Sequence, residues 1–379
     1  MKDQGGSSGH LTFLGPLFKW PRKAKRLPGI ICPMDTRQKF RMALLGEGIY
    51  LPETTTIGEV RITRPDLRIG QENLDTLQQL LDQANFGHTI DRPTWMASAA
   101  TGRPLYFATT SWLEADTAPL AHILLTKTVY TLADVLSLAF GGEPRTIGYV
   151  LQMQMPSQEP RTISVAVGGP ARSTSQLQRL KPDSVSLPTI NIQELYDSLV
   201  ERPRVALWAH LFAPIAGEQR WELRALRLTS LLEGIARETT PSNIKLTLPD
   251  GTPLTDRNNK PAKTDTLRGR LYHLVEQACL GMGIPERTVI ATPHETLWSE
   301  SGIWADLRNV IAHDGRWLAA PSWSALATER DRCEAAATLA SLGGSLEEGL
   351  IRYADSLTAA AELVLRYASG GGFDSNVVR

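Results

Sequence analysis

A segment near the C-terminal end of the chain places an arginine, an amide and a histidine close together. Residues 304–315 read WADLRNVIAHDG, and the groups in it that can do chemistry are Arg308, Asn309 and His313. An arginine neutralises the charge of a phosphorane, and a histidine moves protons to and from the 2′-hydroxyl and the leaving oxygen of RNA. Because these groups can cleave RNA without a metal ion, they form the candidate catalytic set.

The positions of these residues on a helix determine how they can act together. Asn309 and His313 are four residues apart, so they share one helical face. Arg308 precedes His313 by five residues, which places the two about 140° apart around an ideal helix. They can meet on one phosphate if the last helical turn is loosened, or if a second copy of the helix faces the first.

A purely structural explanation of the same residues is also open. Arg308 can form a surface ion pair with Asp306 or Glu300. His313 can cap the C-terminus of a helix, which is a common structural role for a basic side chain. Periodicity alone favours this explanation over the catalytic one.

Two stretches of the chain resemble a known family. Residues 307–315, reading LRNVIAHDG, resemble the signature of the HEPN superfamily, whose ribonuclease members carry an arginine, usually a polar residue next, and then a histidine. Residues 226–236, reading LRLTSLLEGIA, resemble the opening helix of bacterial ApeA-like HEPN proteins. Those proteins join a β-rich N-terminal domain to a C-terminal all-α HEPN domain, and the resemblance here covers residues 216–370.

The resemblance implies roles for individual residues. Arg308 and His313 match the catalytic pair, and Asn309 matches the polar position between them. Glu233 matches an acidic residue that some members place on the first helix to orient the site, and Asp306 is a further supporting candidate. Family members typically form homodimers in which two Arg–His sets share one cleft, and many degrade RNA as toxins or antiviral effectors. Other members bind nucleotides or dimerise without cleaving RNA, so a non-catalytic RNA- or nucleotide-binding module is the alternative.

The elements that must hold this site form a predicted helical bundle over residues 216–370. Leucine, isoleucine, valine and alanine recur there at helical spacing. One helix is expected to start at Thr292, break at residues 299–302 and resume to His313. The expected helices span residues 220–237, 265–281, 303–313, 324–342 and 346–368. The expected core residues are Leu228, Leu231, Leu271, Leu274, Leu307, Ile311, Leu357 and Val364.

Residues 41–215 have a different pattern, rich in short β-forming stretches between turn signals. They predict an antiparallel sandwich or barrel. The expected strands include residues 58–63, 104–110, 122–130, 146–153 and 161–167, with short helices at 69–83 and 192–200. This part has no convergent set of histidines, cysteines or carboxylates, so we expect it to regulate the nuclease by binding an unknown trigger or inhibitor.

The ends of the chain and its composition complete the expectation of an α+β protein. Residues 1–40 predict a basic arm, and residues 371–379 a flexible tail. Lysine and arginine number 40, as do aspartate and glutamate, which argues against a protein that coats nucleic acid by bulk charge but leaves a local basic site open. Three cysteines without a paired spacing favour the reducing cytoplasm, and no apolar run is long enough to predict a membrane span. The chain has no Walker lysine and no His-Glu-x-x-His motif, so we expect neither a cofactor nor a bound metal.

Overall fold

The structure is a computed structural model of the 379-residue chain. It describes residues 38–47, 54–63, 105–140, 144–155, 160–167, 191–314 (without 219, 249, 257 and 292–295) and 346–373. The predicted helices at 69–83 and 324–342, and most of the predicted arm and tail, lie outside these residues. The arm prediction overlaps the first strand, which begins at Gln38. Residues 37–379 group as one compact unit, without a division at the predicted boundary of 215 and 216.

The described strands form one antiparallel sheet, in the order β2-β3-β4-β1-β6-β7 with β5 also paired to β1. In the long central strand, Leu44 lies opposite Ala108 on one side and Tyr149 on the other. The predicted sandwich or barrel is therefore wrong for the described residues, which make a single open sheet. The strands are β1 (Gln38–Glu47), β2 (Thr55–Ile57), β3 (Val60–Thr63), β4 (Leu105–Thr110), β5 (Leu113–Ala115), β6 (Arg145–Met153) and β7 (Arg161–Val167).

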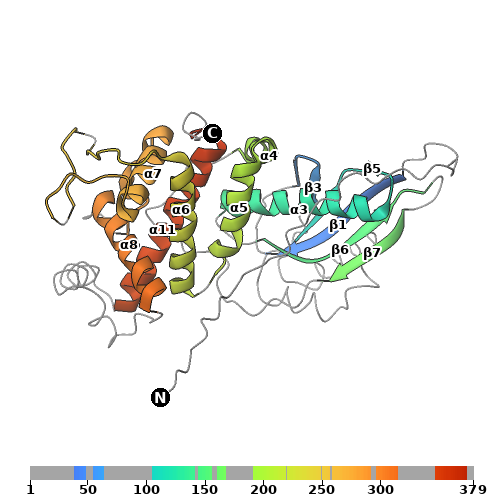
Figure 1. The fold of residues 1–379 in the computed structure, drawn as a ribbon. Helices are drawn as coiled ribbons and strands as arrows, with labels where there is room; N and C mark the ends of the chain where they lie inside the picture. Colours follow the sequence, from blue (N-terminus) through green and yellow to red (C-terminus); the bar gives the residue numbers. More distant parts are fainter. Residues whose placement is uncertain are drawn as a thin grey trace, which may run out of the picture. The chain divides into compact units, whose positions relative to one another are not determined.

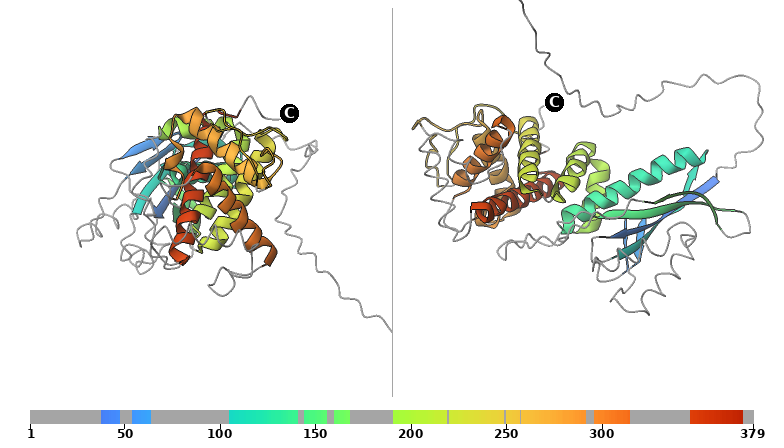
Figure 2. Two further views of the ribbon diagram at one scale, coloured as in Figure 1. Left: turned by 90° about the vertical axis from the view of Figure 1, so that its left-hand side faces the viewer. Right: turned by 90° about the horizontal axis from the view of Figure 1, so that it is seen from below.

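A helix takes the place of the expected second sheet. Helix α3 (Ala118–Phe140) contains residues 122–130, which the sequence predicted to be a strand. This stretch is rich in β-branched residues, but its buried positions, Ala121, Leu125, Val129 and Leu132, recur every three or four residues. That period fits a helix and not a strand, so tertiary burial outweighs the local β propensity. Figures 1 and 2 show α3 running along the sheet, where it packs on β1, β3 and β5.

The rest of the described chain is helical except for one long connection. The confirmed predictions include the helix at 192–200, four of the five bundle helices, with 303–313 as part of α8, and the burial of seven of the eight core residues. The side chain of the eighth, Ile311, is not among the described ones. The elements are α4 (Ile192–Glu201), α5 (Pro203–Ala216), α6 (Trp221–Thr239), α7 (Leu267–Met282), the short η1 (Glu286–Thr288), α8 (Leu297–Asp314) and α11 (Leu346–Ser369).

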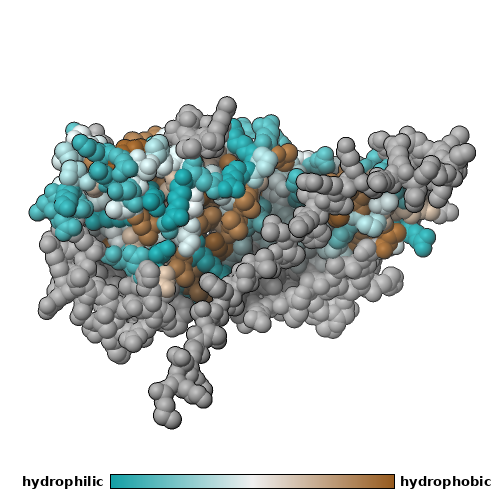
Figure 3. Space-filling view, viewed as in Figure 1, coloured by the Kyte–Doolittle hydropathy of each residue, from teal (hydrophilic) through white to brown (hydrophobic). Residues whose placement is uncertain are grey.

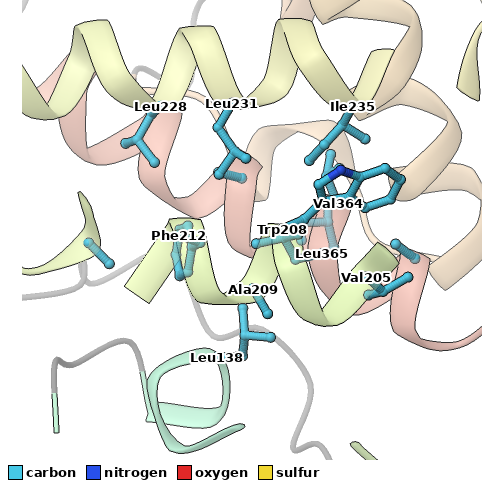
Figure 4. Packing of buried hydrophobic residues seen from close by; sticks show 14 of the residues in the cluster. Leu138, Val205, Trp208, Ala209, Phe212, Leu228, Leu231, Ile235, Val364 and Leu365 are labelled. Carbon is cyan, nitrogen blue, oxygen red and sulfur yellow. The ribbon is translucent and has the colours of Figure 1, made fainter. Parts of the chain in front are cut away.

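Helix α5 joins the sheet-bearing part to the bundle. Figure 4 shows Trp208 and Phe212 of α5 among side chains of α6 and α11, while Ala209 faces Leu138 of α3. All four are buried in the same hydrophobic cluster. The opposite side of α5 is more open, since Leu207 and Leu211 are exposed and hydrophobic residues reach the surface in this region of Figure 3. The hydrophobic core therefore continues from the sheet into the bundle.

Polar contacts complete this junction. Helix α4 meets the β2–β3 turn, where Gly58 N–H donates to Gln193 Oε1 at 2.7 Å. Gly58 has φ 55°, and a Cβ there would overlap the ring of Tyr196, so only glycine fits this turn. Between α3 and α5, His210 Nδ1 lies 3.3 Å from Asp134 Oδ2. Burial raises the pKa of the Asp134 carboxyl to about 6, against the opposing attraction of His210.

A buried arginine of α11, paired within its own helix, joins α11 to the end of α3. Arg366 Nη2 donates to Glu362 Oε1 at 2.5 Å, and the two side chains are only 2% and 4% exposed. The same nitrogen donates to the backbone oxygen of Leu138 at 2.9 Å and to that of Ala139 at 3.3 Å. These carbonyls belong to the last turn of α3, where the backbone oxygens have no N–H donor within the helix.

Helix α8, which carries the candidate catalytic residues, is continuous from Leu297 to Asp314. The predicted break at 299–302 is wrong, because the polar groups there are used inside the bundle. Glu300 is fully buried and accepts hydrogen bonds from Ser356 Oγ at 2.5 Å and from Ala291 N at 2.9 Å. Gly302 leaves room for the Arg268 side chain, since a Cβ on it would lie 3.1 Å from the guanidinium carbon.

The start of α8 also differs from the prediction. The Thr296 hydroxyl accepts a hydrogen bond from Ser299 N at 3.2 Å, which is the contact of an N-terminal cap. The expected start at Thr292 lies among residues that the structure does not describe.

The connection before α7 folds back on itself through short bridges between Lys245 and Lys263 and between Thr255 and Pro261. It therefore forms an ordered wall beside α7 and α8.

Replacement of Leu271 tests the bundle core. Leu271→Ala removes a fully buried side chain of α7, so the free energy of unfolding should fall by about 2–5 kcal/mol. Leu280→Ala on the same helix is the control, because Leu280 is 67% exposed, and it should cost less than about 0.5 kcal/mol. Denaturant unfolding of both variants measures the difference. Similar losses would show that the buried face of α7 is misassigned.

Candidate functional site

Four of the five predicted site residues can be located with their side chains. Arg308 and Asn309 lie on α8, where Arg308 Nη1 donates to Asn309 Oδ1 at 3.1 Å. Asn309 is exposed, while Asp306 is half-buried one turn earlier and has contacts of its own. His313 has its backbone in the last turn of α8, and its side chain lies outside the description.

Glu233 is the partner of Arg308. Its Oε2 lies 3.6 Å from Arg308 Nη2, which brings α6 and α8 together at the site. Its Oε1 lies 2.6 Å from Arg237 Nη2 and 3.4 Å from Arg270 Nη1. One carboxylate therefore meets three guanidinium groups, from α6, α7 and α8. We call these four residues the arginine cluster.

The arginine cluster carries an excess of positive charge in a partly buried place. Three guanidinium groups against one carboxylate leave a formal charge of +2. The side chain of Glu233 is 12% exposed, that of Arg308 28% and that of Arg270 23%, whereas that of Arg237 is 65% exposed. Coulomb interactions are stronger at such depth than between fully solvated groups. The arrangement can therefore attract an anion such as a phosphate.

The cluster was only partly visible in the sequence. The resemblance to HEPN proteins pointed to Glu233 and Arg308, and the structure brings these two together. Arg237 was missed although it is four residues after Glu233, a spacing that pairs charges on a helix. Arg270 gives no local signal, because it comes from another helix. Arg270 also donates to the backbone oxygens of Thr264 at 3.2 Å and Asp265 at 3.0 Å, which fixes its direction.

The continuous helix rules out a loosened last turn, which is one of the two geometries that the sequence left open for Arg308 and His313. Residues 308 and 313 both lie within the α-helical span of α8, so the last turn is not loosened at the backbone. Their positions are therefore about 140° apart around the helix axis. Position 313 shares a face with Asn309, and Arg308 turns toward α6. Within one copy of the chain, the two catalytic candidates lie on different sides of α8.

A cavity of about 630 Å³ lies beside this helix. Its walls come from the connection before α7, from the start of α7 and from α8. Asp306 and Asn309 line it, together with Trp298 and Arg268. The Arg268 guanidinium stacks 3.8 Å from the centre of the Trp298 ring and donates through Nε to the Trp298 backbone oxygen at 3.0 Å. This cavity could not be predicted from the sequence, because its walls are brought together only by the fold.

Comparison with protein-family models, curated proteins and solved structures found no match for this chain. Among the described residues, no group of three or more histidine, cysteine, aspartate or glutamate side chains is placed to hold a metal ion. Within the same residues, no helix combines the length and the apolar character needed to cross a bilayer.

Glu233 should contribute more to folding than a surface carboxylate on the same helix. Glu233→Gln leaves three neighbouring arginines without their counter-charge, so we expect the free energy of unfolding to fall by about 1–3 kcal/mol. Glu238→Gln is the matched control, because Glu238 forms an exposed ion pair with Arg204, and such pairs contribute less than about 1 kcal/mol. Denaturant unfolding should also show that added salt narrows the loss in Glu233→Gln, since salt screens the repulsion. Equal losses in the two variants would contradict this role.

Proposed function

We propose that the chain is a metal-independent endoribonuclease of the HEPN type that cuts RNA in a cleft between two copies of α8. The observation that carries this proposal is the Glu233–Arg308 pair, which holds the candidate catalytic arginine inside a cluster of charge +2. Helices α6, α7, α8 and α11 form a bundle after a β-rich part, the order that the resemblance implies. Two-fold pairing suits the helix geometry, because it lets the Arg308 of one copy approach the 309–313 face of the other.

The chemistry of this proposal uses the 2′-hydroxyl of the substrate as the nucleophile. The imidazole of His313 accepts the 2′-hydroxyl proton while the oxygen attacks phosphorus. The bond from phosphorus to the 5′-oxygen breaks, and water donates a proton to that leaving oxygen. Arg308 stabilises the negative charge that develops on the phosphorane, and Asn309 helps to position the phosphate. The products are a 2′,3′-cyclic phosphate and a free 5′-hydroxyl.

In this proposal the β-rich part regulates the nuclease, and the whole chain acts as a toxin or antiviral effector. The supporting observation is the buried Arg366 contact, which ties the last turn of α3 to α11 of the bundle. A trigger or inhibitor on the sheet can therefore act on the bundle through α3.

A non-catalytic module that binds a nucleotide or RNA is the second candidate. The cavity beside Asn309 favours it, because a cavity of this size lies within the range of small-molecule sites, about 300–1,000 Å³. Only the first candidate predicts cleavage of RNA.

An RNA digest separates the two. The wild-type chain should cut RNA in the presence of EDTA, leave DNA intact because it has no 2′-hydroxyl, and produce 2′,3′-cyclic phosphate ends. His313→Ala and Arg308→Ala should each lower the rate by about 10²-fold or more, and Asn309→Ala should lower it less. Equal cleavage by wild type and His313→Ala, or loss of all cleavage with EDTA, would overturn the mechanism, and absence of cleavage by wild type would favour the binding module.

Mixing two inactive variants tests the shared cleft. Arg308→Ala keeps His313, and His313→Ala keeps Arg308, so a mixed dimer contains one intact arginine and one intact histidine on opposite copies. If the cleft uses residues of both copies, the mixture should recover part of the activity that each variant lacks alone. Light scattering on the same samples should show dimers. Absence of recovery from mixtures that do form mixed dimers would place the whole site within one copy.

A further inference from the structure

We propose that the cavity beside α8 binds the base of the RNA nucleotide next to the phosphate that is cut, so that it selects single-stranded RNA. This inference rests on the proposed function and adds the part of the site that holds the substrate. Two contacts show that the cavity adjoins the arginine cluster. Arg270 of the cluster donates to the backbone of Asp265, and Arg308 donates to Asn309, and both acceptor residues line the cavity.

The charges of the two regions differ in a way that fits a nucleotide. The cavity lining is balanced, whereas the adjoining arginine cluster has a formal charge of +2. A phosphate therefore belongs at the cluster, and an uncharged polar group belongs in the cavity. The charged residues of the lining are Lys260, Lys263 and Arg268 against Asp256, Asp265 and Asp306.

The chemistry of the cavity walls suits a base. Nucleobases stack on aromatic rings and on arginine planes. The cavity wall contains the indole of Trp298, with the guanidinium of Arg268 3.8 Å from the centre of its ring. Amide and carboxylate groups, from Asn258, Asn309 and Asp306, can bond to the edge of a base. A base in a paired duplex cannot enter a cavity of this kind, so the site takes unpaired RNA.

The wall opposite α8 is built firmly enough to serve as a binding surface. Asp256 Oδ1 accepts hydrogen bonds from Asn258 N at 2.8 Å and from Lys260 N at 2.9 Å, which closes the turn at the rim. Leu254 and Ala262 on either side of this turn are buried and bonded backbone to backbone, with Ala262 N donating to Leu254 O at 2.8 Å. The long connection before α7 is therefore part of the site.

Binding of an RNA that lacks bases provides the test. Full-length His313→Ala protein is titrated with a fluorescent single-stranded RNA about ten nucleotides long, and with the abasic ribose-phosphate strand of equal charge. The intact RNA should bind about tenfold more tightly or better, because stacking of a base is lost in the abasic strand. Equal affinity for the two strands, or no binding of either, would overturn the inference.

Filling the cavity shows where this preference arises. Ala305 lines the cavity, so Ala305→Leu places extra carbon atoms in it without removing a polar group, and the preference for the intact RNA should disappear. Ala133→Leu, on α3, is the control and should keep the preference. If circular dichroism shows that Ala305→Leu does not fold, Trp298→Phe should keep the preference and Trp298→Leu should lose it. Retention of the full preference by folded Ala305→Leu or by folded Trp298→Leu would also overturn the inference.

The result is separable from that of the RNA digest. Binding is measured in the His313→Ala background, where no cleavage is needed. RNA cleavage by wild type together with equal binding of intact and abasic strands would remove the base site and leave the nuclease proposal. A base preference that Ala305→Leu abolishes, without cleavage by wild type, would keep the base site on a binding module.

Discussion

The hydrogen bonds of the Arg366 guanidinium to the end of α3 join the sheet-bearing part of the chain to the helical bundle. This guanidinium lies among apolar side chains, paired with Glu362 and donating to the last carbonyls of α3. An unpaired charge at this depth costs several kcal/mol, on the order of 3–5. The hydrogen bonds from Arg366 to the carbonyls of Leu138 and Ala139 therefore tie the end of α3 to α11. Around this contact, Trp208 and Phe212 of α5 fill the space between the sheet-bearing part and the bundle (Figure 4).

The same principle, a buried charge that must be matched, shapes the candidate site. Glu233 satisfies Arg308 from a neighbouring helix and holds Arg237 and Arg270 beside it. Glu300, which is also on α8, accepts hydrogen bonds from the Ser356 hydroxyl of α11 and from the Ala291 backbone N–H. The first of these bonds holds α8 against α11. The position of the catalytic candidates thus follows from carboxylates inside the bundle and not from the exposed residues around them.

Periodicity predicted α4, α6, α7 and α11 and four of the strands, because their buried faces repeat at the spacing of a helix or a strand. It failed at residues 122–130, where β-branched residues hid a helical period, and at residues 299–302, where a Ser-Glu-Ser-Gly run looked like a break. In both places the deciding contacts come from distant segments: the sheet under α3, and Arg268 and Ser356 beside α8. For the site, a resemblance found Arg308 and Glu233, but only the fold could bring Arg270 and the cavity to them.

The way α3 ends has a mechanical consequence. A helix of 23 residues is a rod of about 34 Å that is stiff along its axis, so a change of twist in the sheet arrives at Leu138 and Ala139 as a displacement of their carbonyl oxygens. Arg366 is too deep for water to replace those acceptors during a gradual shift. Packed contacts of this kind have discrete positions instead of a continuous range. A shift of α3 relative to α11 therefore has to break the hydrogen bonds that Arg366 donates to Leu138 and Ala139.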